Sequence, residues 1–164
     1  YVEMIRLKTS VLLAAALKIG AYLADAPAED AEKLYEFGVK MGLAFQLQDD
    51  WLDVYGDPKV FGKNIGGDIL CNKKTFMLIT ALEEANEEQR AALEGWLAAR
   101  EYVPAEKIAA VTALYNEIGV GKRCQEMAEA LNAEGFAVLD SINLPEERKA
   151  VLKEYACSML NRNV

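Results

Sequence analysis

Apolar residues recur at helical spacing along most of the chain, and the strict alternation typical of strands is nearly absent. The first such pattern runs from the start to about Leu23 and contains Ile5, Leu12, Leu13, Ala16 and Leu17. It ends near Asp25-Ala26-Pro27, because the residue before a proline disfavours the helical region. The pattern therefore predicts an all-α chain.

Proline and glycine divide the rest of the chain into further helices. Pro27, Pro104 and Pro145 stand where helices are expected to begin. Acidic residues follow Pro27 and Pro145 in the first turn, where the helix dipole favours them. The expected helices cover about 27–55, 68–85, 87–99, 104–133 with a break at 119–121, and 145–160. We expect residues 1–164 to form one compact unit.

Two glycines lie inside the expected helix over 27–55. Gly38 and Gly42 each cost about 1 kcal/mol of helix stability relative to alanine. Their four-residue spacing places both on one helix face. We therefore expect a close neighbour at that face.

The composition is that of a globular protein. Apolar residues make up 52% of the chain, which argues against disorder. The net charge is −8, from 18 basic and 26 acidic residues, and this argues against a nucleic-acid partner. A small phosphate ligand remains compatible with it. No stretch approaches the roughly 20 apolar residues of a transmembrane segment, and no secretory signal opens the chain.

Histidine and cysteine usage narrows the chemistry. The absence of histidine excludes a histidine-bound metal and a Ser-His-Asp triad, so a metal would need oxygen ligands, as Mg²⁺, Mn²⁺ and Ca²⁺ prefer. Three widely spaced cysteines, Cys71, Cys124 and Cys157, indicate reduced thiols in a cytoplasmic protein.

The segment 46–53 contains the most informative chemistry. Asp49 and Asp53 are four residues apart and share a helix face, with Asp50 beside them and Gln46 one turn earlier. Like charges at this spacing repel, and a divalent cation removes that repulsion. A solvated acidic face is the alternative. The apolar neighbours argue against it, because buried acids need partners; they are Phe45, Leu47, Trp51 and Leu52.

Lysines on either side of this segment supply the opposite charge. Lys63 follows a glycine, Lys73 and Lys74 are expected on the helix over 68–85, and Lys8-Thr9 interrupts the first apolar pattern. Lysine binds phosphate oxygens as a compact cation. A lone lysine is usually a solvated surface charge, so the functional interpretation depends on the order of these residues along the chain.

The ordered set resembles the trans-isoprenyl diphosphate synthase family, in particular the farnesyl and geranylgeranyl diphosphate synthases. The matching residues are Lys8-Thr9, Phe45-Gln46-Leu47-Gln48-Asp49-Asp50-Trp51-Leu52-Asp53-Val54, Gly56-Asp57-Pro58, Gly62-Lys63, Asp68-Ile69 and Lys73-Lys74-Thr75. These motifs fall within residues 1–85, and the remainder fits as family-like helices. The resemblance implies the isoprenoid-synthase helical bundle, of which this chain is the C-terminal part only.

The resemblance also implies roles for the aspartates. Asp49 corresponds to a direct Mg²⁺ ligand in the family's second aspartate-rich motif. Asp50 and Asp53 correspond to further ligands or to holders of the metal's water shell. Mg²⁺ is thus the implied cofactor, with Mn²⁺ as its substitute.

Roles for the other polar residues follow from the same resemblance. Lys8 and Lys63 correspond to contacts with the allylic diphosphate, and Lys73 is a further candidate for that phosphate region. Thr9 and Gln46 correspond to dipoles beside the allylic carbocation. The implied reaction condenses dimethylallyl or geranyl diphosphate with isopentenyl diphosphate. Farnesyl diphosphate is the default product, and a cytoplasmic homodimer is the family expectation.

The chain departs from the family in containing one aspartate-rich motif where the family has two. The other would lie upstream of Tyr1, where the chain opens within a helical pattern and without a capping residue. We therefore expect the N-terminal part to be missing and these 164 residues to be inactive alone.

Two other functions remain open at this point. A class I terpene cyclase would have an Asn/Asp, Ser/Thr and Glu triad in place of Asp49–Asp53, and none is found. A non-catalytic subunit of a prenyltransferase heteromer would often lack Asp49, Asp53 or Lys63, which are all retained. A purely structural bundle would leave the ordered polar set unexplained.

Overall fold

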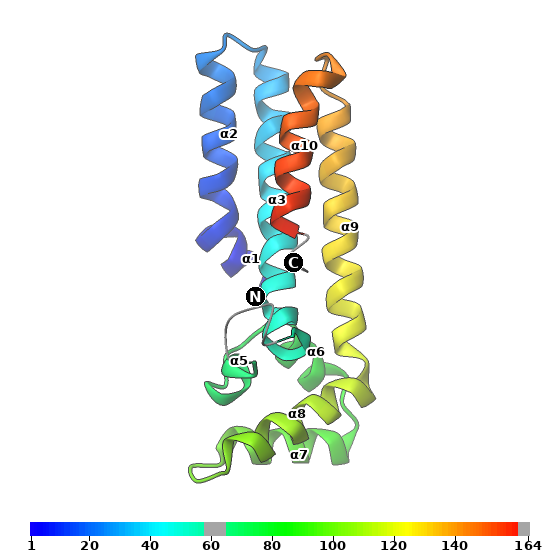
Figure 1. The fold of residues 1–164 in the computed structure, drawn as a ribbon. Helices are drawn as coiled ribbons and strands as arrows, with labels where there is room; N and C mark the ends of the chain where they lie inside the picture. The colour runs from blue at the N-terminus through cyan, green and yellow to red at the C-terminus, as the bar shows by residue number, and fades with distance from the viewer. Residues whose placement is uncertain (58–64, 161–164) are drawn as a thin grey trace. The chain divides into compact units, whose positions relative to one another are not determined.

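The computed structural model describes residues 1–57 and 65–160, and all regular elements in these ranges are helical (Figure 1). They are α1 (Val2–Ile5), the π-helix η1 (Arg6–Ser10), α2 (Val11–Leu23), α3 (Ala28–Tyr55), α5 (Gly67–Leu70), α6 (Phe76–Glu84), α7 (Glu87–Ala98), α8 (Pro104–Ile118), α9 (Val120–Asp140) and α10 (Glu146–Leu160). The all-α prediction is confirmed.

Contacts group the chain into two compact units. One, here the aspartate unit, consists of residue 1 and residues 49–125. The other, here the bundle unit, consists of residues 2–48 and the chain from residue 126 onward. Helices α3 and α9 each contribute residues to both units.

The bundle unit has its core between α3, α9 and α10. Its buried centre consists of Phe37, Met41, Leu139, Ile142 and Ala156. The rings of Phe37 and Phe136 meet with centroids 6.3 Å apart. Within this unit α2, α10 and the adjoining stretches of α3 and α9 run alongside one another (Figure 1).

Close packing at the two glycines of α3 confirms the neighbour expected from their spacing. A Cβ atom on Gly38 would lie 2.6 Å from the Cα of Ala14. A Cβ atom on Gly42 would lie 2.7 Å from the Cα of Ser10. The two glycines therefore let η1 and α2 approach the backbone of α3.

Most helix limits agree with the prediction. Helix α2 ends before Asp25, whose φ of 54° is left-handed, and α3 begins at Ala28 directly after Pro27. Gly119, with φ of 83°, ends α8 and separates it from α9, as the predicted break at 119–121 requires. Helix α9 then continues to Asp140, seven residues beyond the expected end (140 − 133).

The prediction of a single helix over 68–85 is wrong, because two helices occupy this range. Helix α5 ends at Leu70, and α6 begins at Phe76. Asn72 lies between them with φ of 49°, and the Thr75 hydroxyl caps α6 by accepting a hydrogen bond from Leu78 N–H at 3.3 Å. Lys73 and Lys74 therefore lie in a connection and not on a helix.

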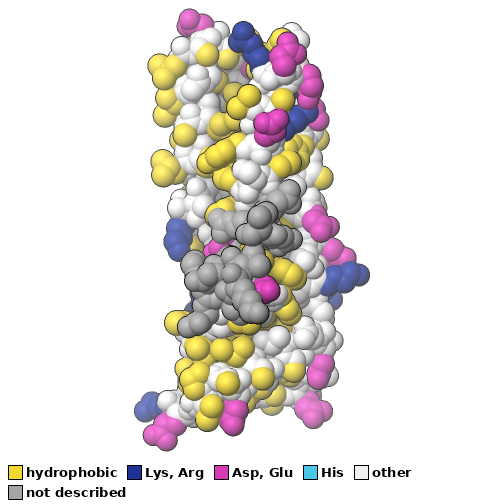
Figure 2. All heavy atoms as spheres, viewed as in Figure 1, with side chains coloured by type: hydrophobic (Ala, Val, Ile, Leu, Met, Phe, Trp, Pro, Cys, Tyr) yellow, Lys and Arg dark blue, Asp and Glu magenta, His cyan; other side chains and the backbone are white. Residues whose placement is uncertain are grey.

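Helix α2 exposes several large apolar side chains. Leu12 is 78% exposed, Ile19 57% and Leu23 83%. Figure 2 shows hydrophobic side chains along the edge that α2 forms. In the part of the chain that the structure describes, no helix has the length and apolar character needed to cross a membrane.

Candidate diphosphate and metal site

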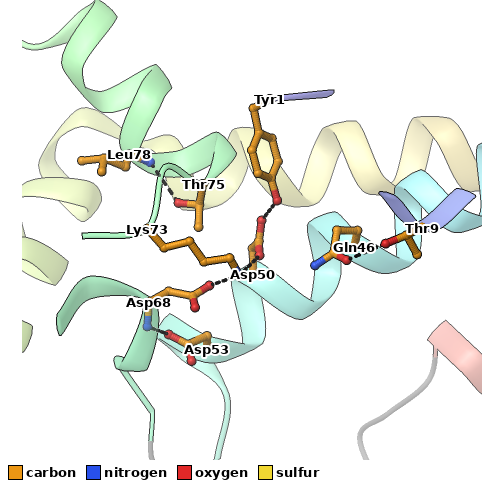
Figure 3. A network of polar contacts seen from close by, with 9 residues as sticks. All are labelled: Tyr1, Thr9, Gln46, Asp50, Asp53, Asp68, Lys73, Thr75 and Leu78. Carbon is orange, nitrogen blue, oxygen red and sulfur yellow. Dashed lines mark hydrogen bonds and ion pairs between the residues drawn. The ribbon is translucent and has the colours of Figure 1, made fainter. Parts of the chain in front are cut away.

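Asp50 is the buried centre of the polar network in the aspartate unit. Its side chain has no exposed surface. The Tyr1 hydroxyl donates to Oδ2, and Lys73 Nζ donates to Oδ1 at 3.1 Å (Figure 3). Burial raises the pKa of Asp50, and the hydrogen bonds from Tyr1 and Lys73 act against it. The carboxylate thus has partners on both oxygens.

Lys73 joins two carboxylates. Its Nζ also donates to Asp68 Oδ2 at 2.7 Å, so one ammonium group bridges Asp50 on α3 and Asp68 on α5 (Figure 3). Burial alone would lower the pKa of Lys73. The hydrogen bonds to Asp68 and Asp50 outweigh it and raise that pKa. The neighbouring Lys74 is exposed.

Asp53 fixes the start of α5. Its Oδ2 accepts a hydrogen bond from the backbone N–H of Asp68 at 2.9 Å. Gly66, at φ of 82°, directs the chain into this contact and donates its N–H to the carbonyl of Asp53. Burial raises the pKa of Asp53, and the nearby negative charges of Asp68 and Asp49 act in the same direction.

The donor chemistry of this cluster fits a hard divalent cation. Asp49 and Asp53 are half-buried on adjacent turns of α3, and Asp68 lies against Asp53. Carboxylate oxygens are the ligands that Mg²⁺ prefers, usually one or two together with water and substrate phosphate. Asp50 fits direct ligation less well, because Tyr1 and Lys73 already bind its oxygens.

The same cluster is not a complete metal cage. Over residues 1–57 and 65–160, no group of three or more His, Cys, Asp or Glu side chains is arranged to hold a metal ion alone. Oxygen atoms from outside this set would have to complete the coordination of a metal held at Asp49 and Asp53.

The bundle unit contains three further predicted site residues, Lys8, Thr9 and Gln46. Thr9 Oγ1 donates to Gln46 Oε1 at 3.3 Å, which joins η1 to α3 (Figure 3). Lys8 precedes Thr9 on the π-helix and is exposed. Single π turns within α-helices often occur at functional sites. The hydrogen bond brings Thr9 and Gln46 into direct contact. Lys63 lies outside the described residues.

Two participants in the network were not predicted from the sequence. Tyr1 contacts Asp50 across 49 residues, and no local pattern indicates such a pairing. The sequence indicates Asp68 only as part of the family motif. Its place at the start of α5, directly after two glycines, was the available signal for its approach to Asp53.

An aromatic pair follows the aspartates on α3. The rings of Trp51 and Tyr55 have centroids 5.2 Å apart and are tilted by 33°. The Tyr55 hydroxyl donates to Asn116 Oδ1 at 3.0 Å, and a Cβ atom on Gly121 would lie 2.7 Å from the Tyr55 ring. These contacts hold the end of α3 against α8 and the start of α9.

Comparison with known proteins agrees with this chemistry. A model of the polyprenyl synthetase family matches residues 1–118. A short chain isoprenyl diphosphate synthase of Methanothermobacter thermautotrophicus is 35% identical over 155 residues, which are 94% of this chain and 43% of that protein. A (2E,6E)-farnesyl diphosphate synthase of Mycobacterium tuberculosis is 33% identical over 160 residues, which are 94% of this chain and 44% of that protein.

A solved structure extends the comparison to the fold. The geranylgeranyl pyrophosphate synthase of Corynebacterium glutamicum, complexed with isoprenyl diphosphate and magnesium, matches with a TM-score of 0.85 and 30% identity. The match covers 99% of this chain and 47% of that one. The chain therefore spans less than half the length of these relatives.

The helical architecture is that of the isoprenyl synthase fold, and within it Lys73 bridges Asp50 on α3 to Asp68 on α5. The chain belongs to the polyprenyl synthetase family. These relatives give no support to the terpene cyclase or the regulatory-subunit alternative.

Proposed function

We propose that the protein containing this chain is a Mg²⁺-dependent prenyltransferase that condenses an allylic diphosphate, dimethylallyl or geranyl, with isopentenyl diphosphate. The supporting observation is the bridge from Lys73 to Asp50 and Asp68, together with the hydrogen bond from the Asp68 backbone N–H to Asp53. The bridge places a lysine cation, which can bind a diphosphate, among carboxylates, which can hold a metal ion.

Asp49 and Asp53 are the proposed metal-holding residues, with water and diphosphate oxygens completing the coordination. Bound Mg²⁺ would supply positive charge that makes the diphosphate a better leaving group. Asp50 has a different task in this proposal: its buried carboxylate holds Lys73 in place. Lys73 in turn presents its remaining N–H to a diphosphate oxygen.

In the bundle unit, Lys8 is a proposed contact with the allylic diphosphate, and Lys63 has the same proposed role. The Thr9 and Gln46 oxygens are proposed to face the allylic cation as it forms, where oriented dipoles stabilise positive charge. The proton lost at the end of the condensation would pass to the departed diphosphate. None of these steps needs histidine or a cysteine thiolate.

Farnesyl diphosphate is the proposed product, and a cytoplasmic homodimer is the proposed state. Support for the product is the Mycobacterium tuberculosis relative, whose name specifies it. The Corynebacterium glutamicum relative is named for the longer geranylgeranyl product. Product analysis is therefore part of the test.

The test is a Mg²⁺-dependent condensation assay on the full-length gene product, with products separated by chain length. Asp53→Ala should lower kcat/KM by at least about 100-fold, because it removes a metal oxygen and the anchor of α5. Glu83→Ala, at an exposed acid on α6, is the matched control and should retain full activity. Equal activity of Asp53→Ala and Glu83→Ala would overturn the assignment.

We also propose that these 164 residues do not catalyse the condensation alone, because they contain a single aspartate-rich motif. A mass-verified preparation of the 164-residue chain should show no turnover under conditions in which the full-length protein is active. A clear turnover rate from that preparation would refute this.

A further inference from the structure

Lys107 is a lysine buried inside the aspartate unit. It lies on α8 with 1% of its surface exposed. Its Nζ donates to Asn72 Oδ1 at 2.6 Å and lies 4.3 Å from the centroid of the Tyr102 ring. Among the described residues, no carboxylate oxygen lies within 4 Å of this ammonium group. Burial of a cation among neutral partners is costly, so its location calls for an explanation.

Asn72 is the residue through which Lys107 acts on the site. Its φ of 49° places it in the left-handed region, which asparagine adopts more readily than most residues. Its side chain is held at both ends: Oδ1 accepts from Lys107, and Nδ2 donates to the carbonyl of Leu97 at 3.1 Å. The turn directly before Lys73 is thereby tied to α7 and α8.

Tyr102 makes a second contact with the connection between α5 and α6. Its hydroxyl donates to the carbonyl of Leu70 at 3.2 Å, while its ring faces the Lys107 ammonium. The two contacts hold the connection on either side of Cys71. Lys73 follows immediately and reaches Asp50 and Asp68.

We propose that Lys107 is a positioning residue for the diphosphate site: through Asn72 it fixes the left-handed turn that holds Lys73 between Asp50 and Asp68. This rests on the proposed function, since it assigns Lys73 to diphosphate binding. Lys107 itself contacts neither of these carboxylates. Its removal should therefore act on the site only by releasing the connection.

The test measures binding of inorganic pyrophosphate at saturating Mg²⁺ by calorimetry on the full-length protein. Lys107→Met keeps the length of the side chain and removes the ammonium group. Asn72→Gly keeps the left-handed backbone accessible and removes the side-chain contact. Each should weaken pyrophosphate binding about 10-fold, the range seen when a supporting contact of a metal site is lost. Because both changes remove the same contact between Lys107 and Asn72, the double variant should bind no more weakly than the weaker single variant.

Lys149→Met is the matched control for loss of a buried lysine. Lys149 lies in the bundle unit, is 7% exposed and donates to the carbonyl of Asp140 at 3.0 Å. This variant should melt at a lower temperature and bind pyrophosphate as the unaltered protein does.

The outcomes separate the two proposals. If the unaltered protein does not bind pyrophosphate with Mg²⁺, the proposed function fails and this inference fails with it. If it binds, and Lys107→Met lowers the melting temperature with unchanged affinity, the positioning role alone is overturned. Losses that add in the double variant would also overturn it. If Lys107→Met does not fold, Asn72→Gly decides, and unchanged affinity in that variant rejects the inference.

Discussion

The ammonium group of Lys73 lies 3.1 Å from a carboxylate oxygen of Asp50, a residue with no exposed surface, although the lysine side chain itself is 38% exposed. The pair therefore connects the interior of the aspartate unit to its surface. A partly exposed lysine whose ammonium group is held by a buried acid is suited to binding an anion without losing its own orientation.

Replacing Lys73 by methionine should weaken both pyrophosphate binding and the fold. The buried Asp50 carboxylate would keep its hydrogen bond from Tyr1 but lose the one from Lys73, and this loss should cost about 1–3 kcal/mol of unfolding free energy. Lys74→Met is the matched control, since Lys74 is exposed and adjacent. Urea denaturation of both variants measures the difference. Equal stability of the two would show that the bridge does not stabilise the fold.

Two glycine-to-alanine changes should have opposite effects on stability. In Gly42→Ala the new Cβ would lie 2.7 Å from the Cα of Ser10, so the helices must separate, at a cost of about 1–3 kcal/mol. Gly95 on α7 has no heavy atom within 4 Å of an added Cβ, so Gly95→Ala should stabilise by up to about 1 kcal/mol. Thermal melts of the two variants should move in opposite directions. A shift of both in one direction would contradict the close packing at Gly42.

The stability of the protein should fall at alkaline pH because of Cys124. Burial raises the pKa of the Cys124 thiol from 9.0 to about 12, and the charge of Asp50 acts in the same direction. A thiol whose pKa is higher in the folded than in the unfolded protein contributes its full stabilisation below the unfolded-state pKa. This contribution is lost as the pH rises from the unfolded-state pKa through the folded-state pKa. The unfolding free energy should therefore decrease between about pH 9 and 12, by at most about 4 kcal/mol.

Removal of the thiol should flatten this dependence. Cys124→Ala should show a smaller decrease in unfolding free energy over the same pH range, whereas Cys71→Ala, at an exposed cysteine, should leave the decrease unchanged. Burial also raises the pKa of Tyr115, which adds loss of stability in the same sense at higher pH. Identical pH profiles for Cys124→Ala and Cys71→Ala would rule out the buried thiol as the cause.

The N-terminal cap of α7 should contribute measurably to stability. Asn86 Oδ1 accepts from Gln89 N–H at 2.9 Å, and Gln89 Oε1 accepts from Asn86 N–H at 3.1 Å. Asn86→Ala removes the acceptor of the Gln89 N–H and should cost about 1 kcal/mol. Asn143→Ala, at an exposed asparagine in the connection before α10, serves as the comparison and should cost nothing. Chemical denaturation distinguishes the two.

The sequence predicts most of the fold because its helix limits coincide with strong local signals. Pro27, Pro145 and Gly119 mark ends of helices through backbone geometry alone, which does not depend on tertiary contacts. The break before α6 was missed because lysine is a good helix former and the apolar spacing continues across it. Thr75, a capping residue directly before an apolar run, was the available signal.

The candidate site was predictable only in part, for a related reason. Asp49, Asp50 and Asp53 stand close together in sequence, so one helix face accounts for them. The partners of Asp50 come from positions 49 and 23 residues away, and the contact from Lys107 to Asn72 spans 35. Helical periodicity indicates which face of a helix is buried, but it contains no information about which distant side chain meets it.

The aromatic pair after Asp50 contains an intrinsic fluorescent probe. Trp51 is the next residue along α3, its ring packs against Tyr55, and the sequence contains two tryptophans in all. Replacement of Trp96, on α7, by phenylalanine would leave Trp51 as the sole indole emitter. Its fluorescence would then follow the arrival of a metal ion or an anion at the neighbouring aspartates in real time, with no dye attached to the protein.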